Sequence, residues 1–190
     1  QTTQEFQLLY SGGERLSGVL GLFYFDGTAG GIVEAIFYTN FPNTTEGYVD
    51  TKSYALYADM DYKLTDQLTL NLGLRPTREE KHGVAFNVYN TDTTFTDYYF
   101  VAADFDDETT FTSWAPKIGL DYQFNQDVMG YFSLNRGFKS GGYNVRAQSN
   151  IFPESAEPFD DETLDMAEVG LKTTLADGRL VLNSAVFYGQ

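Results

Sequence analysis

Residues 68–75 read Leu-Thr-Leu-Asn-Leu-Gly-Leu-Arg, and this stretch decides the fold class. Leucine occupies every second position, and the positions between the first and last leucine are polar or small. Successive side chains of a β-strand point to opposite faces, whereas a helix repeats about every 3.6 residues. The stretch therefore predicts a β-strand with one leucine face and one polar face.

The same alternation continues on both sides of this strand, for example in residues 54–62 and 114–124. Short turn signals, such as Gly12-Gly13 and Asp177-Gly178, separate the alternating runs in pairs. Together they predict eight strands in four hairpins, at about 3–11, 15–26, 51–64, 67–81, 109–124, 128–138, 163–175 and 179–189.

The connections between the hairpins are predicted to be long loops, at about 27–50, 82–108 and 139–162. Short and long connections alternate strictly, so all short turns should lie on one rim of the sheet. Most predicted strands run to about 11–16 residues, roughly twice the usual globular length. These features predict an all-β fold, an antiparallel transmembrane β-barrel segment of about eight strands in four hairpins; the resemblance described below implies that it is part of a larger barrel. A soluble β-sandwich shares the alternation and remains the alternative.

Composition excludes several classes of function. The chain has 190 residues, of which 27 are acidic and 12 are basic, and its net charge is −15. Such an acidic chain is unsuited to nucleic-acid binding, which needs a basic surface. It contains no cysteine, and its single histidine is His82, so thiolate chemistry is excluded and few catalytic arrangements remain. No stretch of 18 apolar residues is present, which excludes a membrane-spanning helix.

Three stretches resemble the β-barrel of TonB-dependent receptors, the outer-membrane active transporters of Gram-negative bacteria. Residues 114–122 resemble the family pattern PK-x-G-x-x-Y, and residues 159–172 resemble F-x-P-E … Y-E-x-G-x-K. The most specific match is residues 131–144, which are similar to Y-x-S-x-S-R-G-F-K-S-G-G-Y/F-N. Residues 75–81 also look like the strand end R-Y-T-x-E. The sequence departs from these patterns at Pro76, Asp161 and Ala167.

The resemblance implies that residues 1–190 are a partial TonB-dependent receptor β-barrel domain without its plug domain. Such barrels resemble a wall of about 22 strands closed around an N-terminal plug. The implied function is uptake of a scarce nutrient, above all a ferric siderophore-type chelate, across the outer membrane with TonB-coupled energy. The implied partners are the TonB complex, through the missing plug, the lipid bilayer, lipopolysaccharide and the nutrient ligand.

Three other functions stay open on the sequence alone. A passive outer-membrane porin would share every pattern, and a soluble β-rich ligand-binding module would share the alternation. An outer-membrane enzyme is the weakest alternative, because His82 lacks evident catalytic partners. We therefore expect no enzymatic activity, no catalytic residue, no bound cofactor and no metal site.

A few polar residues are candidates for the lumen or rim of the barrel, namely Lys117, Arg136, Lys139 and Glu168. Arg136 and Lys139 could attract an anionic ligand, but we favour ion pairs with Glu168 or a nearby acid. Tyr143 is a candidate ligand contact in a long loop, although loop aromatics can equally pin loops together.

Two further features have a functional and a structural interpretation. His82 could bind iron or a chelate, but an exposed rim histidine is the interpretation we favour. The acidic run at residues 104–108 has some likeness to a calcium-binding loop, yet the glycine and glutamate positions of an EF-hand are absent. We expect this run to be a solvated loop.

Overall fold

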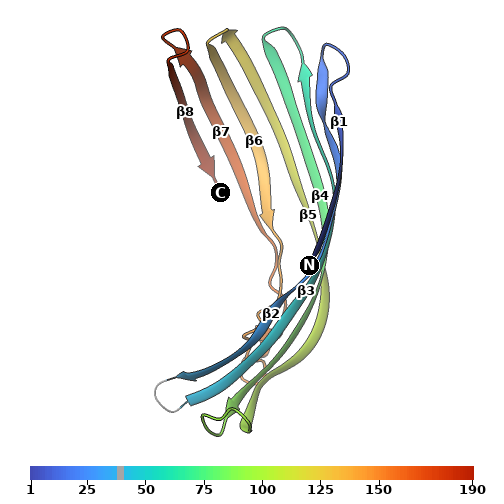
Figure 1. The fold of residues 1–190 in the computed structure, drawn as a ribbon, viewed down its shortest axis with the longest axis vertical. Helices are drawn as coiled ribbons and strands as arrows, with labels where there is room; N and C mark the ends of the chain where they lie inside the picture. Colours follow the sequence, from blue (N-terminus) through green and yellow to red (C-terminus); the bar gives the residue numbers. More distant parts are fainter. Residues whose placement is uncertain (38–40) are drawn as a thin grey trace.

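The structure, a computed structural model, describes residues 1–37 and 41–190, and most of these residues form one antiparallel sheet. The eight strands pair in the order in which they occur along the chain (Figure 1). They are β1 (Thr2–Tyr10), β2 (Leu16–Phe37), β3 (Phe41–Lys63), β4 (Leu68–Asn90), β5 (Tyr98–Asn125), β6 (Val128–Lys139), β7 (Glu162–Leu175) and β8 (Leu180–Gly189). The predicted all-β fold with eight antiparallel strands is confirmed.

The sheet is curved but not closed in the part of the chain that the structure describes, and β1 and β8 are its edges (Figure 1). The short turns lie together at one end of the sheet, as predicted. One short 3-10 turn, η1 (Pro153–Ala156), lies between β6 and β7. Within residues 1–37 and 41–190, no helix has the length and apolar character that crossing a membrane would require.

The two faces of the sheet differ in character, and the strand register keeps them apart. Leu72 of β4 pairs with Met60 of β3 and Ile118 of β5, so their side chains share one face, called here the apolar face. Asn71 pairs with Asp61 and lies on the opposite side, the polar face. The leucine alternation at residues 68–75 therefore marks one strip of a face shared by neighbouring strands.

The apolar face is open to the surroundings. Leu72, Ile118 and Leu134 keep 45%, 47% and 44% of their surface exposed. No large side chain among the described residues is fully buried. A β-sandwich would cover these side chains with a second sheet, whereas the described residues form a single layer. The described residues therefore do not form a β-sandwich, and the exposed continuous apolar band suits a lipid environment.

Two of the three predicted long loops are wrong, because most of their residues are strand. β2 runs to Phe37 and β3 starts at Phe41, so the predicted loop at 27–50 is strand wherever it is described; residues 38–40 lie outside the described residues. Likewise β4 runs to Asn90 and β5 starts at Tyr98, which leaves only 91–97 of the loop predicted at 82–108. The third predicted connection, at 139–162, is a real loop between β6 and β7.

The strands that replace these loops form a wall beyond the apolar band, called here the extension. It comprises residues 26–37, 41–52, 78–90 and 98–112, from β2 to β5. β5 alone has 28 residues, far more than the 9–11 or so that a membrane-spanning strand needs. The extension therefore projects well past the thickness of a bilayer, at the end of the sheet opposite the short turns (Figure 1).

Candidate functional site

Residues 140–161, which connect β6 to β7, lie on the polar face of the extension and are called here the strap. The Lys81 Nζ atom of β4 donates a hydrogen bond to the Gly141 carbonyl oxygen at 2.6 Å. The Asn87 Nδ2 atom, further along β4, donates to the carbonyl oxygens of Val145 and Ala147 at 3.1 and 2.8 Å. Figure 1 shows the strap as a thin orange trace inside the curve of the sheet.

The strap also reaches the free edge of β5. The ladder between β5 and β6 begins at Lys117, so the earlier part of β5 has an edge that β6 does not pair. Near the far end of that edge, the Asn150 backbone amide donates to the Ala102 carbonyl at 3.0 Å. The Asn150 side chain donates to the Val101 carbonyl at 2.8 Å. The strap thereby covers backbone groups that would otherwise be open to pairing with another chain.

Two glycines make room for the strap on the wall. A Cβ atom on Gly47 of β3 would lie 2.5 Å from the Val145 Cβ atom. A Cβ atom on Gly83 of β4 would lie 2.5 Å from the Tyr143 ring. Both distances are shorter than an ordinary contact between side-chain carbons, so a side chain at either position would require the strap to shift.

Tyr143 is held between the strap and the wall, with 6% of its surface exposed. Its ring lies 6.1 Å from the Phe105 ring, centroid to centroid, and its hydroxyl donates to Asp107 Oδ2 at 3.1 Å. Burial, together with the hydrogen bond to Asp107, raises the pKa of Tyr143 to about 12. The role of Tyr143 as a ligand contact stays a prediction; in this conformation its ring is covered by the wall.

The best-packed region of the described chain lies under the strap. Ala85 of β4, Ala103 of β5 and Ala147 of the strap are exposed by 1%, 0% and 1%. Asn87, which bonds two strap carbonyls, is 4% exposed. Small side chains allow the backbone layers to approach, and the Asn87 Nδ2 donors are bonded to strap carbonyls, whereas its buried Oδ1 atom has no partner among the described residues.

Three of the predicted lumen or rim residues lie on the polar face. Lys117 Nζ contacts Asp59 Oδ2 at 3.2 Å, across β5 and β3. Glu168 accepts a hydrogen bond from the Tyr131 hydroxyl at 2.5 Å. The Nζ atom of Lys139, at the end of β6, lies 3.6 Å from Oε2 of Glu162, at the start of β7. These contacts orient polar groups toward the inner side of the curved sheet, and the two exposed ion pairs contribute little stability each.

Arg136 lies on the other side of the sheet. The register of β6 and β7 pairs Arg136 with Asp165, and the alternation of β6 places Arg136 on the same face as Leu134, the apolar face. Arg136 Nε and Nη2 lie 2.6 and 2.7 Å from the two carboxylate oxygens of Asp165. Its ion-pair partner is therefore Asp165; Glu168 projects from the opposite face.

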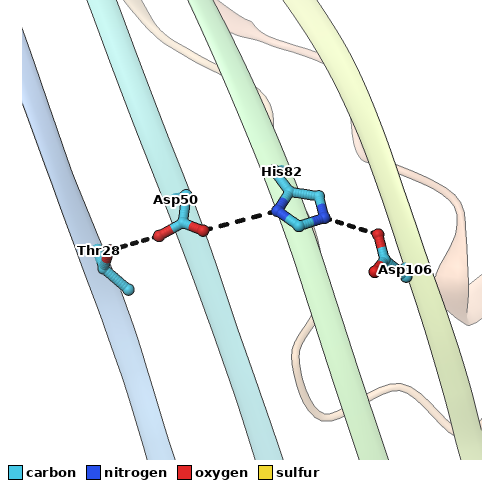
Figure 2. A network of polar contacts seen from close by, with 4 residues as sticks. All are labelled: Thr28, Asp50, His82 and Asp106. Atoms are coloured by element: carbon cyan, nitrogen blue, oxygen red, sulfur yellow. Dashed lines mark hydrogen bonds and ion pairs between the residues drawn. The ribbon is translucent and has the colours of Figure 1, made fainter.

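Sequence reasoning missed a chain of polar contacts that crosses four strands of the extension (Figure 2). His82 Nε2 lies 2.6 Å from Asp106 Oδ1 of β5, and His82 Nδ1 lies 3.6 Å from Asp50 Oδ2 of β3. Thr28 of β2 donates a hydrogen bond to the other oxygen of Asp50. The sequence offered no signal for this contact, because it depends on the register of strands that were predicted as loops.

The acidic residues around His82 belong to strands, so the predicted solvated loop at 104–108 is wrong for its secondary structure. The histidine faces a recess of about 350 Å³ whose other lining residues are Asp26, Asp50, Lys52, Glu80 and Glu108. The hydrogen bond with Asp106 raises the pKa of His82, Asp50 adds to this, and partial burial opposes it. A protonated His82 partly neutralises an otherwise acidic recess.

Replacing His82 by glutamine is expected to lower thermal stability more at low pH than at high pH. The folded-state pKa lies above the usual value of 6.5, so the stabilisation is complete below pH 6.5 and is lost as the pH rises through the folded-state pKa. The measurement is the difference in unfolding midpoint between wild type and His82→Gln from about pH 5.5 to 9. A difference that stays constant or grows with pH would contradict this account.

Across residues 1–37 and 41–190, no group of three or more His, Cys, Asp or Glu side chains could hold a metal ion. The strap, the polar face and the extension are the surfaces that we consider for contact with a ligand.

Comparison with solved structures finds the same fold in three receptors. The ferric yersiniabactin uptake receptor of Yersinia pestis matches 98% of this chain with a TM-score of 0.80 at 20% identity. The ferric-catecholate import receptor of E. coli K12 matches 98% of this chain with a TM-score of 0.66 at 15% identity. The alcaligin outer membrane receptor of Bordetella pertussis also matches 98% of it, with a TM-score of 0.60 at 18% identity. At these identities the likeness concerns the fold. The chain spans 28–30% of the length of the chains it matches.

A protein-family model is the stronger finding. The model described as TonB dependent receptor-like, beta-barrel, matches residues 1–190, including the part that precedes the stretches quoted above. The eight-stranded sheet, its open apolar face and its inner strap are all consistent with a section of a large barrel wall. The chain therefore belongs to the TonB dependent receptor-like β-barrel family.

Proposed function

We propose that residues 1–190 form part of the barrel domain of an outer-membrane receptor that takes up a ferric siderophore-type chelate with energy from TonB. In this proposal the plug domain and the contact with the TonB complex belong to another part of the full protein. The apolar face meets the outer-membrane lipid of a Gram-negative bacterium, and the extension rises through the lipopolysaccharide layer. The family is one of transport receptors and not of enzymes.

The observation that carries the proposal is the continuous apolar face, with Leu72, Ile118 and Leu134 exposed on three different strands. A single layer with such a face requires an apolar solvent on one side and a polar lumen on the other. The family match adds the receptor class. The ligand class is supported by the solved relatives, two of which are described as receptors for ferric yersiniabactin and for ferric catecholate.

The full-length receptor should restore growth and radiolabelled iron uptake in an iron-starved Gram-negative host that lacks its own siderophore receptors. A panel of ferric hydroxamate, catecholate and mixed chelates is supplied, and the empty vector serves as the control. Uptake of at least one chelate is expected in cells with TonB, and its loss is expected in an isogenic strain without TonB.

Each other outcome points to a different function. Uptake that persists without TonB would indicate a passive porin, the alternative that shares the barrel. A receptor that reaches the outer membrane but supports no ferric chelate would overturn the proposed ligand class. Membrane localisation is checked by fractionation, so that a failure of folding is separated from a failure of transport.

A further inference from the structure

We propose that the strap stays docked on the wall during uptake, and that its exposed face is the surface that an incoming ligand meets. This inference rests on the proposed uptake function, which supplies the ligand. It assigns a fixed position to a segment of 22 residues that the sequence presents only as a long loop. A connection of this length is otherwise the natural candidate for a lid that lifts.

The first argument is that the strap is attached at several separate points. The side chains of Lys81 and Asn87 of β4 donate hydrogen bonds to backbone carbonyls in the first part of the strap. Further along the strap, the Asn150 side chain donates to a backbone carbonyl of β5. Ser113 of β5 donates to Asp161 at the end of the strap at 3.1 Å. A lid would have to break all of these bonds together, and the Asn87 amide would exchange its two strap carbonyls for water.

The second argument is that the strap is itself folded. Gly142 and Phe159 exchange two backbone hydrogen bonds, of 3.1 and 2.8 Å, which connect the beginning of the strap to its end. The Gln148 backbone amide donates a hydrogen bond to Ser155 Oγ at 3.0 Å, and Ser155 lies in the short turn η1. A segment with internal bonds and shape-matched contact to Gly47 and Gly83 behaves as part of the wall.

The third argument concerns the face that the strap presents to the inner side of the sheet. Tyr143 and Ala147 are buried, whereas Asn144 and Arg146, which alternate with them, are exposed. Phe152 is 54% exposed on the second half of the strap. A guanidinium and an aromatic ring suit an anionic ligand with flat groups, such as a ferric chelate.

A disulfide between Gly47→Cys and Val145→Cys tests whether the strap must lift. A Cβ atom on Gly47 would lie 2.5 Å from the Val145 Cβ, and a disulfide needs about 3.5–4.5 Å, so a shift of about 1 Å suffices. The wild-type sequence has no cysteine to interfere. In the full-length receptor, the pair should oxidise fully, and chelate uptake should be the same before and after reduction. The single variants Gly47→Cys and Val145→Cys are the controls, and Gly47→Cys alone should resist trypsin cleavage after Arg146 as wild type does, so that an effect of the added side chain is separated from motion of the strap.

Two results would overturn the docked strap. The first is a disulfide that forms but abolishes uptake until a reductant restores it, as a moving lid requires. The second is a pair that stays reduced while both thiols react with maleimide, which places the strap away from Gly47. If wild type takes up no ferric chelate, the proposed function fails, while the cross-link still decides whether the strap is docked.

A second variant tests the exposed face. Arg146→Gln should raise the Kd for the transported chelate by about tenfold, the value of a lost charge-assisted hydrogen bond. The matched control is Arg179→Gln, an exposed arginine in the short turn between β7 and β8, at the other end of the sheet. An unchanged Kd for Arg146→Gln, or an equal increase for both variants, would overturn the assignment of this face to the ligand.

Discussion

The full-length receptor with Leu72→Arg is expected to lose about 2–4 kcal/mol of unfolding free energy, the cost of an arginine at the middle of the lipid-facing band. Leu72 lies within the leucine run of β4, between Met60 and Ile118 of the neighbouring strands. Its side chain is 45% exposed on the apolar face, so the guanidinium would meet hydrocarbon on one side and apolar neighbours on the other.

The matched control is Asn71→Arg, the same substitution one residue earlier on the polar face. Asn71 donates hydrogen bonds to Asp61 and Asp121, at 2.8 and 3.3 Å, so an arginine there would find two carboxylates. We expect its effect to stay within about 0.5 kcal/mol. Unfolding by urea in lipid vesicles measures both variants. Equal losses at the two positions would contradict the assignment of the faces.

Gly83→Val is expected to release the strap from the wall. A Cβ atom at this position would lie 2.5 Å from Cγ and 2.9 Å from Cβ of Tyr143, and neither atom is the flexible end of a side chain. Overpacking of this kind usually costs about 1–3 kcal/mol, which the strap can avoid by leaving the wall. The exposed Arg146 on the strap would then become a site for trypsin, because proteolysis requires local unfolding.

The measurement is the rate of trypsin cleavage after Arg146 in outer membranes that carry the full-length receptor. Wild type should resist cleavage, and Gly83→Val should be cut at the rate of an unstructured loop. Gly31→Val is the control, because a Cβ atom there would meet nothing within 4 Å. Cleavage of wild type and Gly83→Val at the same rate would contradict the role of this glycine.

The sequence predicted the eight strands well wherever one face meets an apolar environment. In residues 68–75 the leucines mark every second position, because each of them projects from the apolar face. The extension was missed because this pattern ends beyond the apolar band. Asp50 and His82 lie on the continuation of the apolar face, and polar residues there occupy both faces, so the alternation disappears. Composition there resembles a loop, although the backbone pairing continues.

The candidate site depends on long-range pairing that no local pattern encodes. Nothing in the sequence around Gly83 indicates a special role, and only the structure shows that Tyr143 lies directly over it. Arg136 was predicted to lie in the lumen or at the rim. It lies two residues after Leu134 in β6, and this spacing places both side chains on the apolar face. The partner of His82 was hidden because Asp106 belonged to a predicted loop. In each case the sequence shows which residue is present, but the residue that it contacts depends on pairing with a segment elsewhere in the chain.

Neighbouring strands in the chain are neighbours in the sheet, from β1 to β8. The pairing of the wall therefore needs only contacts between strands that follow each other in the chain, each strand adding to the edge of its neighbour. The outer part of β5 is the exception, because the group that covers its edge, Asn150, follows Val101 by 49 residues. We expect the strap to dock last, so this edge is the place where slow or faulty assembly of the wall would leave a template for aggregation.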